Sequence, residues 1–143
     1  MSYNQNNQEN SGKGGVNLND LMDTPDFTGQ FDPADVAANK TLSLFSYLNL
    51  LLLIPLLAVP RSRYARFHVN QGLVLLLCEI VWGVLTAIVG LIFGFIPFVG
   101  WLVKLIMRLV NLVFIVLAIM GIVNAVGGRA KPLPIIGDIT ILR

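Results

Sequence analysis

The sequence predicts an all-α integral membrane protein with three transmembrane helices and a disordered N-terminal tail. Of its 143 residues, 55% are hydrophobic and only 13% are charged, and the mean hydropathy is +0.74. Such a composition is atypical of a soluble globular domain. The apolar residues also lie mostly in three segments, and each is long enough to cross a hydrocarbon core of about 30 Å as a helix.

Residues 1–40 are predicted to form the disordered, acidic tail, because they are rich in Asn, Gln, Gly and Asp and poor in side chains that build a core. Two lysines oppose six acidic residues there, so the segment has a net charge of −4, which leaves +6 for the rest of a chain whose net charge is +2. No basic stretch followed by a short apolar one opens the chain, so a cleaved signal peptide is not predicted. The first apolar segment is therefore expected to be a permanent anchor.

The predicted transmembrane domain covers residues 41–128, with spans at about 41–59, 71–95 and 98–127. Pro55 is expected to bend the first span near its end, and Pro60 is expected to terminate it. The third segment is longer than a perpendicular span requires. Residues 98–108 are therefore expected either to tilt with that span or to lie along the surface as a fourth, interfacial helical segment.

Basic residues predict the orientation of the three spans. Three arginines lie in the loop between the first and second spans, and the C-terminal tail, residues 129–143, is also basic. Three spans put this loop and this tail on the same side, and the positive-inside rule makes that side cytoplasmic. The C-terminal tail is then expected to pack at the membrane surface, whereas the acidic N-terminal tail lies on the opposite side.

Polar residues within the second and third spans predict an ion pair. Glu79 falls on a polar stripe of the second span, and Arg108 falls on a similar stripe of the third. Counted from the two ends of the hairpin, they lie at nearly equal depth, where an unpaired charge costs at least about 2.5 kcal/mol. We therefore predict a Glu79–Arg108 pair, with Lys104 reaching outward. The pair is interpreted as a structural tie or as part of a proton or ion path, and the lack of internal repeats favours the tie.

No catalytic, cofactor-binding or metal site is predicted. Cys78 is the only cysteine and His68 the only histidine, so the usual sets of metal ligands are missing. No nucleophile, base and oxyanion-stabilising group can be assembled either. We therefore predict that the protein is not an enzyme and needs no cofactor. The arginines of the loop are expected to bind anionic lipid head groups of the bilayer, and no nucleic-acid partner is expected.

Three stretches carry a family resemblance: "NKTLSLFSYL", "LIPLLAVPRSRYARFHVNQGLVLLL" and "GIVNAVGGRAKPLPIIG". In this order they resemble bacterial relatives of the plastid inner-envelope import component Tic-twenty, a membrane family mostly known as a domain of unknown function. The resemblance covers residues 35–143. It implies a multi-pass protein of a bacterial cytoplasmic membrane. The plastid member is a four-span subunit of a protein-import channel, whereas this chain shows three clear spans, so import activity is not carried over.

The residues of the predicted cytoplasmic side that we single out are called the cytoplasmic-face signature. They are Arg61, Arg63, Arg66, His68, Asn70, Gln71, Asn124 and Lys131. Because the loop and the tail lie on one side, we expect them to pack together. His68, Asn70 and Gln71 would then satisfy backbone groups of the tail. This arrangement is either a structural lock or a docking face, and the two interpretations are compatible.

The sequence therefore favours a small, non-enzymatic integral membrane protein that scaffolds or helps to assemble a membrane complex. The alternative is a subunit of an oligomeric transporter or channel, in which the intramembrane polar residues form a path. The first hypothesis predicts a partner membrane protein at the signature, and the second predicts a homo-oligomer.

Overall fold

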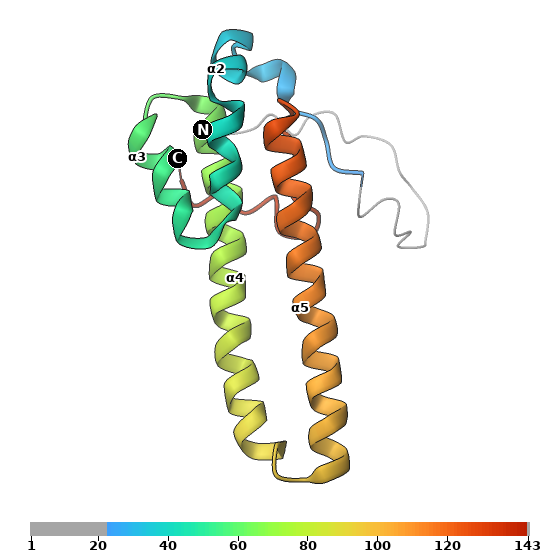
Figure 1. Ribbon diagram of the computed structural model, residues 1–143. Helices are drawn as coiled ribbons and strands as arrows, with labels where there is room; N and C mark the ends of the chain where they lie inside the picture. The colour runs from blue at the N-terminus through green and yellow to red at the C-terminus, as the bar shows by residue number, and fades with distance from the viewer. Residues whose placement is uncertain (1–22, 143) are drawn as a thin grey trace.

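The computed structural model describes residues 23–142, and all regular secondary structure in this part of the chain is helical. The two longest helices, α4 (Arg63–Phe93) and α5 (Pro97–Val126), form an antiparallel hairpin (Figure 1). Shorter helices lie beside one end of it: η1 (Thr28–Gln30), α2 (Pro33–Ser43), η2 (Leu44–Tyr47), η3 (Asn49–Leu52) and α3 (Leu53–Ala58). We call these short helices, the adjoining end of the hairpin and residues 127–142 the head.

Local sequence explains where the two long helices begin and end. At the start of α4, the Ser62 hydroxyl accepts a hydrogen bond from the Ala65 N–H at 3.0 Å, which satisfies one of the free N–H groups of the first turn. Pro97 opens α5, where its fixed φ suits a first turn and its missing N–H costs nothing. Gly128 follows α5 with a φ of +71°, a left-handed conformation that favours glycine.

Helices α4 and α5 are long and apolar enough to cross a membrane. They contain 31 and 30 residues, or about 45 Å each at 1.5 Å per residue, against about 30 Å of hydrocarbon. Between residues 76 and 116 only Gly100 is buried, so most of their apolar surface has no protein neighbour within the described chain. These helices coincide with the predicted spans at 71–95 and 98–127. Residues 98–108 continue α5 without a break, so a separate interfacial helix does not form there.

The predicted span at residues 41–59 is not a single helix. This stretch is divided among the end of α2, two 3₁₀ helices and α3, and we call residues 33–58 the broken segment. Asn49, the first residue of η3, has a φ of 51°, a left-handed conformation that prevents a right-handed helix from running on from η2 into η3. The chain reverses there, so that α3 returns beside α4 (Figure 1). The prediction of three spans is therefore not confirmed, because the described residues contain two candidate spans.

The predicted disordered tail is wrong for residues 23–40, whereas residues 1–22 lie outside the described residues. Phe31 is only 6% exposed, and its ring packs edge-on against Tyr64 and Phe67 at centroid distances of 6.0 and 5.7 Å. The Phe27 N–H donates to the Ala130 carbonyl at 3.0 Å. Two phenylalanines thus supply the apolar contacts that the overall polar composition concealed.

The two ends of the described chain lie at the same end of the hairpin. Residues near Phe27 and Thr28 contact Ala130, whose N–H donates to the Thr28 hydroxyl at 2.9 Å. Two antiparallel helices return the chain to the side from which it started (Figure 1). The predicted placement of the acidic segment and the basic tail on opposite sides is therefore wrong for residues 23–40, because the broken segment does not form a third span.

The apolar core of the described residues lies in the head. One cluster joins η2, α4, α5 and the C-terminal tail, and a second joins residues before α2 to the start of α4. The first contains Tyr47, Leu75, Leu117, Ala125 and Leu133, and the second contains Phe31, Tyr64, Phe67 and Ala130. The apolar core therefore lies against the first turns of α4 and the last turns of α5.

Candidate functional site

The first three turns of α4 carry most of the cytoplasmic-face signature, and the structure divides its members into an inner and an outer group. His68, Asn70 and Gln71 are each at most 1% exposed. Arg63, the first residue of the same helix, and Arg61, in the turn before it, are exposed. The inner group contacts other parts of the head, whereas the outer pair faces away from it.

Asn70 and Gln71 hold the C-terminal tail, as predicted. The Gln71 side chain donates from Nε2 to the Gly137 carbonyl at 2.9 Å and accepts from the Leu133 N–H at 3.0 Å. Asn70 donates from Nδ2 to the Ile139 carbonyl at 2.9 Å, and its Oδ1 accepts from the N–H groups of residues 141 and 142. Buried backbone groups that lack regular secondary structure require such partners. The side-chain amides of Asn70 and Gln71 therefore supply the hydrogen bonds that backbone groups of the tail would otherwise make in a helix or sheet.

His68 has a different role from the one predicted. Its Nδ1 shares a 2.7 Å hydrogen bond with the hydroxyl of Tyr47, which lies in η2 rather than in the tail. The rings of Tyr64 and Phe67 pack edge-on against the imidazole at 4.8 and 5.1 Å. Its Nε2 makes no hydrogen bond of normal geometry among the described residues, although the Arg129 backbone lies beside it. The imidazole thus connects α4 mainly to the broken segment.

The remaining signature residues take part in the same packing. The Asn124 carbonyl accepts from the Arg129 N–H at 2.8 Å, which turns the chain after α5. The Tyr64 hydroxyl donates to the next carbonyl, that of Ala125, at 2.8 Å. Lys131 and Arg66 are half-buried at the edge of the head. Asn124 therefore acts through its backbone, which side-chain reasoning could not predict.

Asp35 is a site residue that the sequence analysis missed, because it was assigned to the disordered tail. Its Oδ2 accepts from the Tyr64 N–H at 3.0 Å, and its Oδ1 accepts from Asn39 Nδ2 at 2.8 Å. A carboxylate of α2 thus lies at the N-terminus of α4, where negative charge is favourable. Burial raises the pKa of Asp35, but hydrogen bonds led by one from the Ser62 side chain outweigh this effect and hold that pKa below its usual value. The Asp32–Pro33 pair, a helix-start pattern, is the signal that could have revealed α2.

Replacing Asp35 with asparagine is expected to lower the free energy of unfolding by about 1 kcal/mol near neutral pH, because an amide accepts more weakly at a helix N-terminus. Since the folded-state pKa of Asp35 is lowered, the carboxylate stabilises the protein above its ordinary pKa of 3.8, and this contribution disappears as the pH falls through the lower folded-state value. Unfolding in detergent micelles at a series of pH values measures both effects. The wild type should lose more stability on acidification than D35N.

The matched control for Asp35 is Asp138, an exposed carboxylate of the tail. Asp138→Asn should leave the pH dependence of unfolding as it is in the wild type. Equal pH dependence of D35N and the wild type would contradict the proposed role of the Asp35 carboxylate.

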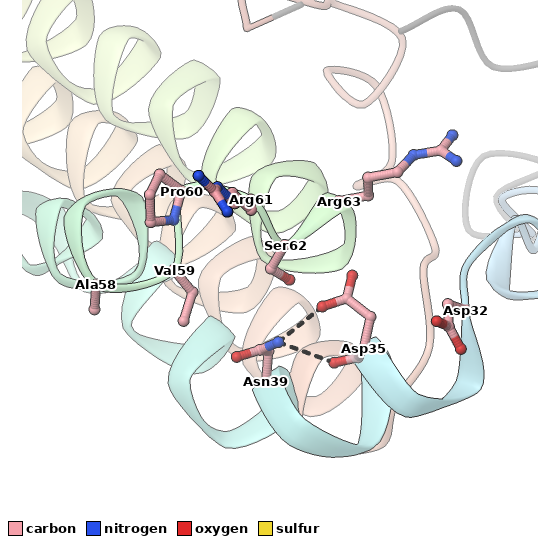
Figure 2. Close-up of a pocket in the computed structure, with 9 residues that line it drawn as sticks. All are labelled: Asp32, Asp35, Asn39, Ala58, Val59, Pro60, Arg61, Ser62 and Arg63. Atoms are coloured by element: carbon pink, nitrogen blue, oxygen red, sulfur yellow. Dashed lines mark hydrogen bonds between the residues drawn. The ribbon is translucent and has the colours of Figure 1, made fainter.

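An open groove of about 680 Å³ lies between α2, the end of α3 and the start of α4. Figure 2 shows Asp35 beside Asn39 and Ser62 in this groove, with the Arg63 side chain extended away from it. The lining contains two carboxylates and two guanidinium groups: Asp32, Asp35, Arg61 and Arg63. Within residues 23–142, no three His, Cys, Asp or Glu side chains lie close enough to bind one metal ion. The groove can therefore offer polar and charged contacts to a head group or a peptide.

The predicted Glu79–Arg108 ion pair does not form within the described chain. Trp82 Nε1 donates to Asn111 Oδ1 at 3.0 Å, and the Thr86 hydroxyl contacts Met107 Sδ at 3.6 Å. This register places Glu79 level with residue 114, about 9 Å along the axis from Arg108. Helical side chains also lean toward their own N-termini, so in an antiparallel hairpin these two lean apart. Counting depth from the two ends of the hairpin was wrong, because the register of α4 against α5 separates Glu79 and Arg108 along the axis by six residues.

Comparison with known proteins finds no matching protein-family model, no matching curated protein and no matching solved structure. The family resemblance of the sequence therefore stays a prediction.

Proposed function

We propose that the chain is a non-enzymatic integral membrane protein that scaffolds or helps to assemble a membrane complex. The observation that carries this proposal is the division of the cytoplasmic-face signature. Its buried amides are occupied by backbone groups of the tail, so they hold the head in one shape. Arg61 and Arg63 remain exposed beside the groove. A preorganised surface with exposed arginines suits a partner or anionic lipid, because little ordering entropy is lost on binding.

The proposed location is a bacterial cytoplasmic membrane, with α4 and α5 crossing it and the head on the cytoplasmic side. Basic residues at the head, including Lys40, Arg61, Arg63 and Arg129, support this orientation through the positive-inside rule. With two crossing helices, no polar segment of the described chain has to pass through the membrane. The alternative of a transporter subunit uses Glu79, Lys104, Arg108 and Asn111 as a polar path. Because Glu79 and Arg108 do not meet within the described chain, we favour the scaffold.

Photo-crosslinking from position 63 tests the proposal in native membranes. Arg63 is exposed at the head and lines the groove, so a photoreactive residue there should form one distinct adduct with another polypeptide, identified by mass spectrometry. The matched control is position 91, because Leu91 is 72% exposed on the far half of α4 and should yield lipid adducts. If position 63 also yields lipid adducts alone, the scaffold proposal is wrong.

A further inference from the structure

The broken segment contains a helix that is too short to cross a membrane. Residues Asn49–Ala58 form a continuous apolar helical stretch from η3 into α3. Its ten residues rise by at most about 20 Å with their 3₁₀ turn, against about 30 Å for the full hydrocarbon core. It therefore reaches little more than one leaflet.

Most of this short helix presents large apolar side chains that no other part of the described chain covers. Leu52 and Pro55 are buried toward the rest of the head. Leu50 and Leu57 are 73% and 75% exposed, and three further residues of the stretch are also exposed: Leu51, Leu53 and Ile54. Five exposed aliphatic side chains on ten residues would be unfavourable in water.

Charge identifies what covers this apolar surface. Arg61 and Arg63 follow the short helix directly and are exposed, and Lys40 is exposed on the neighbouring α2. An apolar helix face next to basic side chains is typical of segments that lie in the head-group and upper acyl region of one leaflet. Each basic residue near an anionic leaflet contributes about 1 kcal/mol of attraction. The occupant is therefore a phospholipid leaflet.

The broken segment lies along only the first part of α4. Asp35 contacts the Tyr64 N–H near the start of the helix, and the reversal of the chain follows Ser46, whose carbonyl lies against Gly72. These contacts cover nine residues of α4, from Tyr64 to Gly72, or about 12 Å. Between residues 76 and 116, only Gly100 is buried within the described chain, and Figure 1 shows the wide head and the narrow hairpin.

We propose that residues 49–58 of the broken segment form a wedge that inserts into the head-side leaflet alone. The protein then concentrates in membranes whose head-side leaflet is convex, and it promotes that curvature. In this placement the short helix at residues 49–58 adds to the cross-section of α4 and α5 in the head-side leaflet, whereas only α4 and α5 cross the opposite leaflet. A protein that occupies more area in one leaflet than in the other stresses a flat bilayer. The stress falls when the more crowded leaflet expands, which makes the head side of the membrane convex. The inference rests on the membrane insertion assumed in the proposed function, but it does not depend on a partner protein.

Membrane tubes pulled from giant vesicles test the wedge. The full chain, labelled on the tail, is reconstituted into vesicles of zwitterionic and anionic phospholipid, and an impermeant quencher identifies the population with the head outside. This population should be enriched severalfold on the narrow tube relative to the flat vesicle, and the head-inside population should be depleted. Equal density on tube and vesicle would overturn the proposal.

The double variant L50N/L57N replaces the two most exposed apolar side chains of the short helix. Because neither is buried, the head should still fold, which thermal unfolding in detergent checks. The ratio of its density on the tube to its density on the flat vesicle should fall toward one. The matched control is I135N/I139N, which removes exposed isoleucines from the tail outside the broken segment and should sort like the wild type. Wild-type sorting by folded L50N/L57N would also overturn the proposal. Flotation and alkaline extraction report membrane insertion separately, so loss of insertion is distinguishable from loss of curvature preference.

Discussion

Replacing Gly72 with alanine is expected to lower the free energy of unfolding by at least about 3 kcal/mol, because the broken segment could no longer pack against α4. A Cβ atom at this position would lie 1.7 Å from the Ser46 carbonyl oxygen and 2.6 Å from its carbon. Both atoms belong to backbone, so no side-chain rotation relieves the overlap. Thermal unfolding in detergent micelles measures the loss, and limited proteolysis should show cleavage within residues 33–58 that the wild type resists.

The matched control is Gly83→Ala on the exposed face of the same helix, where an added Cβ meets nothing within 4 Å. This substitution should leave stability unchanged or raise it by up to about 1 kcal/mol, since alanine is the better helix former. If G72A and G83A have equal stability, α4 does not contact η2 as closely as the structure indicates.

Replacing Gln71 with leucine is expected to release the C-terminal tail. The free energy that holds the tail against α4 should fall by about 2 to 6 kcal/mol. The leucine fills a similar volume, but it leaves the Gly137 carbonyl and the Leu133 N–H without their present partner in a site where Gln71 is 1% exposed. A buried backbone group that loses its partner retains the full desolvation penalty. Amide hydrogen exchange of residues 133–142 should accelerate strongly, whereas exchange within the far half of the hairpin should change little.

The matched control for Gln71 is Gln30→Leu, because Gln30 is exposed in η1. Q30L should leave amide exchange in residues 133–142 unchanged. Slow exchange of the Leu133 amide in Q71L would show that the tail is held mainly by its apolar contacts, such as the burial of Leu133, and would contradict the role assigned to the amide.

The sequence predicted those features that depend on local chain properties. Long apolar stretches predicted α4 and α5, and Pro97 and Gly128 lie at helix boundaries where their backbone preferences put them. The expectation that Asn70 and Gln71 bind tail backbone also succeeded, because two polar amides next to an apolar segment need partners. Composition wrongly predicted disorder for residues 23–40. The segment is polar overall, but Phe27, Phe31 and Asp35 make specific contacts with the rest of the head.

The sequence by itself determined that the chain is apolar and helical, and that the segments at 71–95 and 98–127 are long enough for a membrane, because hydrophobic length and helix propensity are properties of consecutive residues. Only the tertiary structure decided that residues 41–59 fold back instead of spanning, that Asp35 lies at the start of α4, and that Glu79 and Arg108 are offset. These outcomes depend on the φ of one residue, on the register of two helices and on contacts between segments far apart in the chain. Residue spacing and composition do not predict such contacts, because each contact forms only if it lowers the free energy of the whole packed head.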